Sequence, residues 1–271
     1  GDADQANGDW GSNWGRISHD LTKAEPNVLK EFKMSDDLME FTGVMRKGMK
    51  WSDGTPLTTA DLQYWYEDML LNEEITPLAH MDFRWGGEIM KLDIIDDYSF
   101  KLTFAQPHAH WLLVNVAHYY GFWGNAATWV PAHYMKQFHI KYNDKANDLA
   151  KEAGFDFWYQ LHGARNNTAQ TIERPVLTPY IPVRDTPQMS FWERNPYYYG
   201  VDPEGNQLPY IDKMQMDKAA DLSILDAKIV GGSYDFCAFQ MRILFYATYN
   251  EGAQASNSHI KLWQSGKGSE V

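Results

Sequence analysis

Two kinds of hydrophobic periodicity alternate along this chain. Residues 28–34 and 38–45 are short extended segments separated by a pair of aspartates, a pattern typical of a hairpin. A second pair of segments, 88–95 and 98–104, is divided in the same way. In the last of these, apolar residues at even positions alternate with polar residues at odd positions. The first hundred residues therefore predict two antiparallel hairpins.

Between these hairpins, the stretch from Thr59 to Leu71 follows the helical period. Its apolar side chains recur at spacings of three and four residues, so they share one face, which we expect to pack into the core. The residues of this face are Leu62, Trp65, Tyr66, Met69 and Leu70. Further helices are expected at 107–118, 131–139, 143–153 and 221–230, and further strands at 189–194, 213–217 and 234–239.

Other stretches lack a clear period. Residues 1–20 are rich in Gly, Asp and Asn and predict a loop, and 163–187 contain four prolines and predict an extended stretch that either crosses a sheet or serves as a linker. Residues 155–161 read as a short aromatic segment, and 195–212 as a long loop rich in turn formers. The tail from residue 249 to 271 is polar, and we expect it to be poorly ordered. Together these patterns predict a mixed α/β fold.

Composition narrows the class of protein. The 271 residues carry 24 Lys and Arg against 36 Asp and Glu, a net charge of −12. A nucleic-acid partner is therefore not expected, because phosphate binding requires a basic face. No apolar run approaches the ~20 residues that span a bilayer. The first residues lack the features of a signal peptide, so we expect an exported form to be present here already trimmed.

The most informative stretch runs from residue 45 to 61, Met-Arg-Lys-Gly-Met-Lys-Trp-Ser-Asp-Gly-Thr-Pro-Leu-Thr-Thr-Ala-Asp. Asp53-Gly54 predicts a tight turn, and Thr58 followed by Asp61 predicts a capping box at a helix start. The stretch resembles a signature of the extracytoplasmic solute-binding proteins of oligopeptide- or oligosaccharide-type ABC transporters, solute-binding protein family 5.

Three later stretches resemble the same family. Residues 195–212 contain the run Asp-Pro-Glu-Gly-Asn-Gln-Leu-Pro-Tyr-Ile-Asp, which resembles a loop of the family. Residues 225–235 resemble a family segment that leads from a helix to a strand, with Gly232 and Asp235 at the expected positions. Residues 131–139 match a subgroup pattern. The resemblance covers residues 25 to 240 in family order, so chance is a poor explanation.

The resemblance implies a periplasmic-binding-protein-like (type II) lobe with an inserted α/β subdomain, the second lobe being mostly missing. Residues 1–45 and 170–240 would form the main-sheet portion of lobe one, with 46–169 as the inserted subdomain. Residues 241–271 would begin the crossover to the missing lobe. Family members are considerably longer, so the chain looks like an incomplete copy.

Catalytic and metal chemistry are weakly supported. Adjacent carboxylates such as Glu73-Glu74 point apart, and no nucleophile elbow or nucleotide-binding glycine motif occurs. His108 and His110 are two residues apart on an expected helix, where side chains diverge. We therefore expect no enzyme activity, no catalytic residue, no metal and no cofactor.

Aromatic residues in glycine-punctuated loops are the better candidates for ligand contact. Core helices do not need Trp in such loops, whereas the walls of binding sites often contain it. In the family, the corresponding loops lie toward the cleft between the lobes. The candidate ligand-binding residues are Arg84, Trp85, Tyr119, Tyr120, Trp123 and Trp129. The alternative for each is packing within the subdomain, and the residues leave both open.

The resemblance implies non-catalytic capture of an extracellular solute and delivery to the membrane permease of an ABC importer. The solute would be an oligopeptide or a β-linked oligosaccharide, and the location extracytoplasmic, in the periplasm or, as a lipoprotein, at the cell surface. A carbohydrate-active enzyme or carbohydrate-binding module is the alternative, supported by the aromatic and carboxylate content. A third possibility is that one lobe alone binds nothing tightly, because it cannot enclose a ligand.

Overall fold

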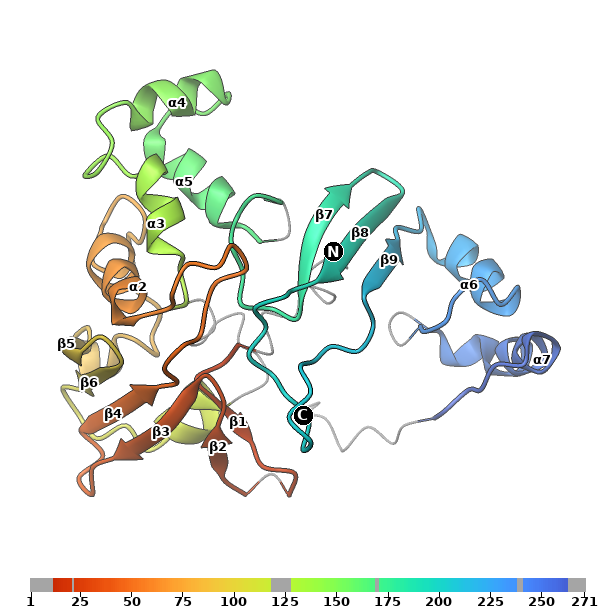
Figure 1. Cartoon of the computed structure of the whole chain (residues 1–271), viewed down its shortest axis with the longest axis horizontal. Helices are drawn as coiled ribbons and strands as arrows, with labels where there is room; N and C mark the ends of the chain where they lie inside the picture. Colours follow the sequence, from red (N-terminus) through yellow and green to blue (C-terminus); the bar gives the residue numbers. More distant parts are fainter. Residues whose placement is uncertain (1–11, 21, 118–127, 169–170, 238–240, 263–271) are drawn as a thin grey trace. The chain divides into compact units, whose positions relative to one another are not determined.

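The computed structural model describes residues 12–20, 22–117, 128–168, 171–237 and 241–262 (Figure 1). The chain divides into two compact units, and each is described by itself. The first comprises Gly1–Asp185 and Ser190–Met216, and the second Thr186–Met189 and Asp217–Val271. Within the described residues, no helix combines the length and the apolar character that crossing a membrane requires.

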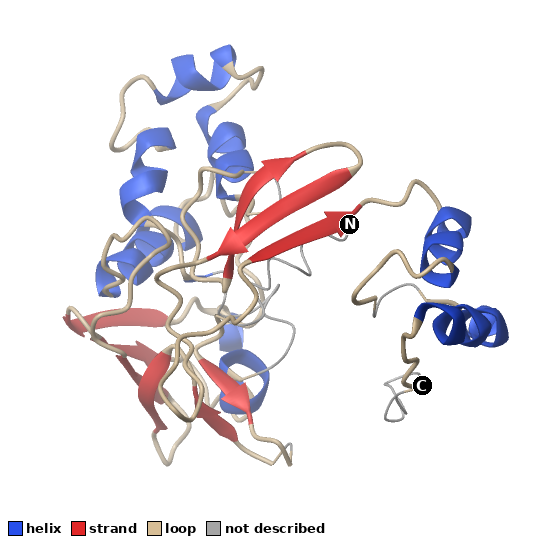
Figure 2. Cartoon of the chain, turned by 45° about the vertical axis from the view of Figure 1, so that its right-hand side comes forward, coloured by secondary structure: helices blue, strands red, loops and turns tan. Residues whose placement is uncertain are grey.

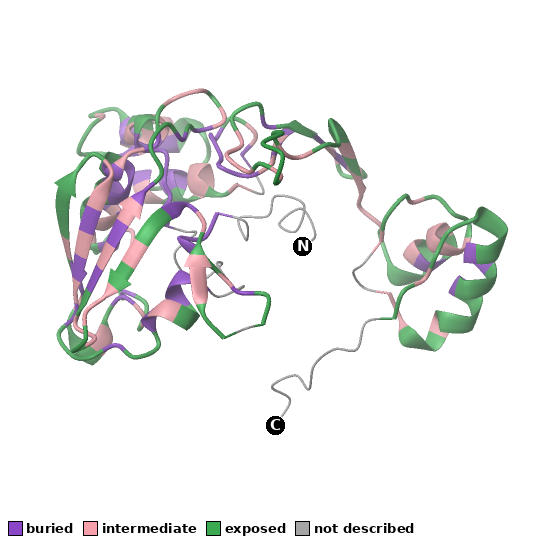
Figure 3. Ribbon diagram, turned by 60° about the horizontal axis from the view of Figure 1, so that its bottom comes forward, coloured by how far each residue is buried: buried purple, intermediate pink, exposed green. Residues whose placement is uncertain are grey.

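A four-stranded antiparallel sheet organises the first unit, with the order β3-β4-β6-β5 (Figure 2). Its strands are β3 (Leu29–Met34), β4 (Glu40–Met45), β5 (Lys91–Asp96) and β6 (Ser99–Thr103). Buried and less buried residues alternate along β4 and β6, because successive side chains of a strand point to opposite faces (Figure 3). Both predicted hairpins are confirmed. A shorter pair, β1 (Gly15–Ile17) and β2 (Ala24–Pro26), precedes them.

Short helices complete the first unit. The predicted helix at 59–71 exists as α2 (Thr59–Tyr64) continued by the π-helix η2 (Trp65–Leu70). Its expected apolar face is confirmed, since Leu62, Trp65 and Leu70 are buried. The remaining helical segments are η3 (Trp85–Gly87), the π-helix η4 (Trp111–Val116), α3 (Ala132–Met135), η6 (Lys136–Phe138), α4 (Ala146–Glu152) and α5 (Trp158–Asn166).

Aromatic rings fill the core between the sheet and these helices. Trp14 is fully buried, and its ring centroid lies 4.9 Å from that of Phe100 and 5.6 Å from that of Phe41. The rings of Trp111 and Trp129 each lie 6.1 Å from Trp14. The Trp14 Nε1 donates to Thr128 Oγ1 at 2.9 Å, so its polar edge is satisfied inside the core.

A second, three-stranded sheet contains β7 (Tyr180–Asp185), β8 (Met189–Arg194) and β9 (Lys213–Asp217), in that order. The loop between β8 and β9 is ordered by Asp202, whose carboxylate accepts hydrogen bonds from Asn206 and Tyr210. These donors lower the pKa of Asp202 to about 2. The turn-rich loop is therefore held by its own polar groups.

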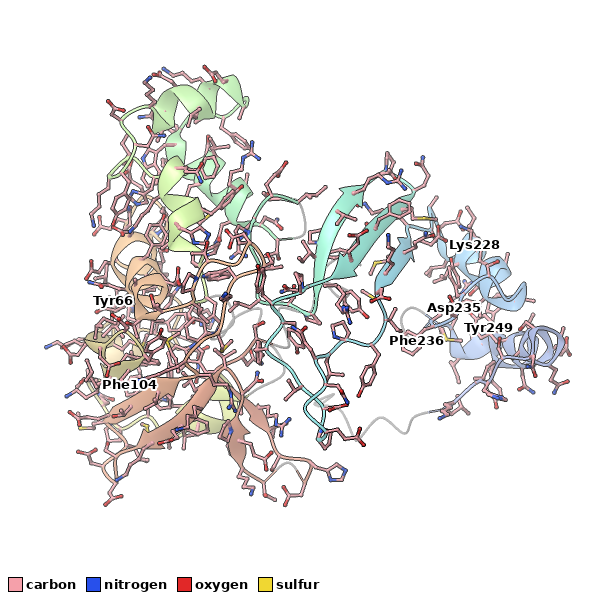
Figure 4. All side chains as sticks on the ribbon, in the orientation of Figure 1. Tyr66, Phe104, Lys228, Asp235, Phe236 and Tyr249 are labelled. Atoms are coloured by element: carbon pink, nitrogen blue, oxygen red, sulfur yellow. The ribbon has the colours of Figure 1, made fainter. Side chains whose placement is uncertain are left out.

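The second unit contains α6 (Leu222–Val230), η7 (Ile243–Phe245) and α7 (Tyr246–Ser256). Asp221 caps α6, accepting from the backbone N–H groups of Ser223 and Ile224. Figure 4 shows Tyr249 on α7 and Lys228 on α6. The Tyr249 hydroxyl donates to the buried Asp226 carboxylate of α6, and Lys228 Nζ lies 2.6 Å from Asp217 Oδ2.

The 45–61 stretch forms the turn and capping box that the sequence predicts. The Asp61 side chain is 5% exposed and accepts three hydrogen bonds from separate segments. Its Oδ2 accepts from Thr58 N and from Trp51 Nε1, both at 3.2 Å, and its Oδ1 accepts from Ala132 N at 3.0 Å. Burial raises the pKa of Asp61, against the opposing effect of these donors. One carboxylate thus joins the turn, the start of α2 and the start of α3.

The same turn is also anchored to later parts of the chain. Ser52 N donates to Val176 O, and Val176 N donates to Ser52 Oγ, both at 3.0 Å. Asp53 Oδ2 lies 2.7 Å from His133 Nε2. Gly54 has φ +87°, and a Cβ at this position would lie 3.1 Å from the Tyr197 hydroxyl. Glycine is therefore required by the turn and by its neighbour.

Several sequence expectations are wrong. Residues 234–237, part of the expected strand 234–239, form no strand, and 238–240 lie outside the described residues. The expected loop 1–20 contains β1 and the central core residue Trp14. Residues 163–166, the start of the stretch expected to be extended, belong instead to α5, whereas residues 180–185 of that stretch are extended as expected and form β7. The tail expected to be poorly ordered begins inside α7.

The compact units do not coincide with the expected domain boundaries. β4 ends at residue 45 and pairs along its length with β6, so one sheet crosses the expected boundary between 45 and 46. The unit boundary at Asp217 also precedes the expected boundary at 240. The assignment of these residues to a main-sheet portion, an inserted subdomain and a crossover stays a prediction.

We expect Asp61→Asn to destabilise the first unit. Both carboxylate oxygens accept N–H groups, so the amide nitrogen of Asn would face a donor and leave it unsatisfied, at a cost of about 1–3 kcal/mol. Urea unfolding followed by circular dichroism measures the change. The control is Asp36→Asn, an exposed turn residue, which should stay within about 0.5 kcal/mol of the parent. Equal stability of the two variants would contradict the role given to Asp61.

We expect Gly252→Ala to destabilise the second unit. A Cβ at Gly252 would lie 2.5 Å from the carbonyl oxygen of Val230, so α7 would have to move away from α6 at a cost of about 1–3 kcal/mol. The matched control is Gly163→Ala in α5, where a Cβ meets no atom within 4 Å. That change should stabilise the helix by up to about 1 kcal/mol. Hydrogen exchange of α6 and α7 compared with α5 measures both effects, and similar responses would refute the close approach.

Candidate functional site

Two of the candidate residues, Arg84 and Trp85, lie at the end of the irregular segment that follows η2. Phe83 anchors this segment: it is 7% exposed, and its ring lies 5.1 Å from that of Trp65. Its backbone N–H donates to His80 O, and its carbonyl accepts from Met90 N at 2.8 Å. Arg84 and Trp85 follow directly, with Arg84 exposed and Trp85 half-buried. A buried anchor thus presents two neighbouring side chains at the surface.

Trp85 is held on three sides. Its ring stacks on that of His108, with centroids 4.1 Å apart and planes 16° from parallel. Its Nε1 donates to Pro107 O at 3.0 Å. The ring of His110 meets it edge-on, at 6.1 Å. Because one face and the N–H edge are occupied, the remaining exposed surface of Trp85 is apolar ring.

Sequence reasoning missed the burial of His108 and its support of Trp85. His108 is 2% exposed and packs against Phe104 at 5.1 Å and Trp111 at 5.3 Å. Burial lowers the pKa of His108, so the ring that supports Trp85 is neutral at pH 7. His110 is exposed whereas His108 is buried, but the helix expected to make them diverge begins only at Trp111, so neither histidine is helical. The available signal for this burial was spacing: His108 precedes Trp111 by three residues, so the two can share one face of a turn.

Glycines allow the backbone to pass beside Trp85. Gly86 has φ +74°, and a Cβ there would lie 2.8 Å from the Cγ of Gln106. Gly87 has φ +91°. These left-handed conformations favour glycine and end η3 immediately after the indole. The glycine punctuation that drew attention to Trp85 in the sequence therefore has a local structural cause.

The other candidate residues are placed differently. Trp129 is 3% exposed and packs in the aromatic core against Trp14, so its side chain offers almost no surface in this structure. Tyr119, Tyr120 and Trp123 lie outside the described residues. A series of ring contacts joins Trp85 through His108, Trp111 and Trp14 to Trp129. Arg84 and Trp85 are thus adjacent at the surface, and Trp129 is connected to Trp85 only indirectly, by this series of ring contacts.

Charged residues flank Trp85 in the sequence, at Asp82, Arg84 and Glu88. His80 Nδ1 lies 3.1 Å from Asp82 Oδ2, an ion pair only when the histidine is protonated. Leu78 and Met81 are 71% and 67% exposed, so this segment also carries apolar surface. Across the part of the chain that the structure describes, no three His, Cys, Asp or Glu residues are grouped so that they could hold a metal ion. The arrangement suits stacking and apolar contact better than acid–base chemistry.

Comparison with known proteins gives one matching family model. Residues 23–259 match the model described as bacterial extracellular solute-binding proteins, family 5 Middle. The match covers most of the chain and includes every stretch on which the sequence resemblance rests.

Among curated proteins, the chain is similar to a periplasmic alpha-galactoside-binding protein of Rhizobium meliloti (strain 1021). The two are 29% identical over 242 residues, which is 89% of this chain and 32% of the relative. A probable ABC transporter-binding protein of Deinococcus radiodurans is 24% identical over 217 residues, 78% of this chain and again 32% of the relative. The chain therefore spans about a third of the length of these relatives.

Two solved structures share the fold. The oligopeptide-binding protein OppA matches with a TM-score of 0.79 and 28% identity, covering 91% of this chain and 40% of that one. The periplasmic binding protein MelB of Agrobacterium fabrum C58, in complex with stachyose, matches with a TM-score of 0.67 and 26% identity, covering 88% and 34%. The predicted fold, part of a type II periplasmic binding protein, is confirmed.

Proposed function

Since this chain belongs to family 5 of the bacterial extracellular solute-binding proteins, we propose that it takes part in capturing an oligosaccharide of the α-galactoside class for an ABC importer. The similar proteins are binding proteins rather than enzymes, and family 5 proteins of ABC importers bind peptides or oligosaccharides. Capture without chemical change is the function that this family membership favours.

The observation that carries the proposal is the presentation of Trp85. Sugar rings have flat apolar C–H faces that pack well on an indole, and Trp85 offers an apolar ring surface whose polar edge is already satisfied. Arg84, exposed beside it, would donate hydrogen bonds to sugar hydroxyls. The relative named for alpha-galactosides and the neighbour solved with stachyose support a sugar over other solutes. They also favour an α linkage over the β linkage expected from the sequence.

A peptide is the second candidate, favoured by one observation. The similarity to the oligopeptide-binding protein OppA has the higher TM-score of the two solved structures, 0.79 against 0.67. An extended peptide is bound chiefly through its backbone and its charged ends. It would depend less on the indole face, so the two candidates differ in what removal of Trp85 should do.

Tyr119, Tyr120 and Trp123 remain proposed ligand contacts in the same function. For Trp129 the burial favours the alternative, packing within the core. Extracytoplasmic location and delivery to a membrane permease are also part of the proposal, and the family membership supports both. Because the chain spans about a third of its relatives, we expect weak affinity from this chain alone, with a Kd of about a millimolar. Ligand pockets usually bury most of the ligand, and part of a binding protein encloses less of it.

We expect stachyose to bind this chain and Trp85→Ala to weaken that binding about 10-fold or more, because the stacking surface is lost. Ligand-observed NMR titration measures both affinities in the millimolar range. The matched control is Phe157→Ala, which removes another half-exposed aromatic, in the segment preceding α5, and should leave the affinity unchanged.

The same titration with trialanine separates the two candidates. Binding of trialanine but not stachyose, insensitive to Trp85→Ala, would replace the sugar by a peptide. Stachyose binding that Phe157→Ala weakens as much as Trp85→Ala would show that the sugar does not stack on Trp85.

A further inference from the structure

A second set of polar side chains packs together in the helical part of the first unit, away from Trp85 in the sequence; four of its five members are buried, and Tyr142 is 43% exposed. We call it the histidine cluster, and its members are Tyr64, Asp68, His139, Tyr142 and His162. Tyr64 belongs to α2 and Asp68 to η2, His139 and Tyr142 follow η6, and His162 belongs to α5. The cluster therefore joins helices that are distant in the sequence.

The hydrogen bonds of His139 fix its protonation state. Its Nδ1 accepts from the backbone N–H of Lys141 at 3.1 Å, so this nitrogen carries no proton. Its Nε2 lies 3.1 Å from the carbonyl oxygen of Asp68, an acceptor only, and 3.5 Å from Asn72 Nδ2; we assign the proton to this nitrogen because the shorter contact requires a donor. A second proton could be added only at Nδ1, where it would face the Lys141 N–H and break that bond.

The surroundings of His162 oppose protonation of its ring even more strongly. His162 is fully buried, and its Nε2 lies 2.8 Å from the Tyr64 hydroxyl. Its Nδ1 is buried and has no hydrogen-bond partner among the described residues. A doubly protonated ring would therefore place a positive charge and an unsatisfied N–H in a site closed to water. Burial lowers the pKa of His162 to about 3, and burial also lowers the pKa of His139.

The charges around the pair do not offset this penalty. Asp68 is 4% exposed, but its carboxylate is already bound by Lys141 Nζ and by the Tyr142 hydroxyl, both at 2.6 Å. The two histidine rings are 5.7 Å apart, so a charge on one opposes a charge on the other. The other charged groups that bear on the cluster are Glu74, whose charge favours a protonated His139, and Lys136, whose ammonium lies over the rings of Tyr64 and Tyr142.

We propose that the histidine cluster is an acid-sensitive clamp, in which proton uptake by His139 and His162 opens the contact of α5 with α2 and η2. Trp158 of α5 packs on His139 with ring centroids 4.5 Å apart, so a displaced His139 also loosens the start of α5. The sheet β3-β4-β6-β5 contributes no side chain to the cluster, so it stays folded when the clamp opens.

The direction with pH follows from the histidines being neutral in the closed form. An exposed histidine takes up a proton near its ordinary pKa of about 6.5, so the open form binds more protons below that pH. The closed form is fully favoured above this value and loses its advantage as the pH falls. Between pH 7 and pH 5 the opening equilibrium should rise by up to about 25-fold for each histidine and about 600-fold for both.

Hydrogen exchange of the whole chain at pH 7 and pH 5, corrected for the intrinsic exchange rate, tests the clamp. Amides of α5 should lose protection by between about 25-fold and about 600-fold, and amides of β4 and β6 should remain more strongly protected than those of α5 at both pH values. Unchanged protection in α5 would overturn the proposal. Equal protection of α5 and the sheet at both pH values would also overturn it, because both would then exchange through one global unfolding.

Replacing one histidine identifies the group responsible. His162→Gln can keep the hydrogen bond to Tyr64 but does not titrate, so the pH effect on α5 should fall to about 25-fold or less. The matched control, His19→Gln, changes an exposed loop histidine and should leave the effect intact. If His162→Gln does not fold, an NMR titration of the histidine Cε1 protons in the parent chain tests the proposal instead. Titration of both buried rings near pH 6.5 with α5 still protected would refute the clamp.

Discussion

The buried carboxylate of Asp61 is the constraint on which the first unit depends. A charge taken out of water must be met by donors, and here the three donors come from the turn, the capping position and the start of α3. Each of these segments is too short to be stable alone. The need to satisfy one anion therefore fixes their mutual arrangement, and the exchange of hydrogen bonds between Ser52 and Val176 extends it to the returning chain.

The aromatic core continues this arrangement toward the surface. Trp14 packs between the sheet and the tryptophans at 111 and 129, and the ring of His108 joins Trp111 to Trp85. The position of Trp85 is thus set by the same packing that stabilises the sheet. The buried histidines have two different structural roles. His108 supports the aromatic surface of Trp85, whereas His139 and His162 hold helices together through polar contacts.

Local patterns predicted the elements whose stability is local. The hairpins, the capping box of Thr58 and Asp61 and the turn at Gly54 follow from alternation, capping and turn chemistry, and all are present. The patterns missed α7, because its polar residues gain their helical order from packing of Gly252 and Tyr249 on α6. They missed the core role of Trp14, because the residues around it are mostly turn formers and show no helical or strand periodicity. At the candidate site, glycine punctuation indicated Trp85, but burial of Trp129 and support from His108 depend on long-range contacts.

The stacked and hydrogen-bonded indole of Trp85 has a consequence for the thermodynamics of recognition. A free surface tryptophan loses rotamer freedom when a ligand covers it, and that lost entropy subtracts from affinity. The indole of Trp85 has already lost this freedom on folding, because His108, Pro107 and His110 hold it in one orientation. Contact with a flat ligand face would then cost less side-chain entropy, so more of its favourable enthalpy would remain as binding free energy. A ligand of another shape would bind less well, because the indole cannot turn to fit it.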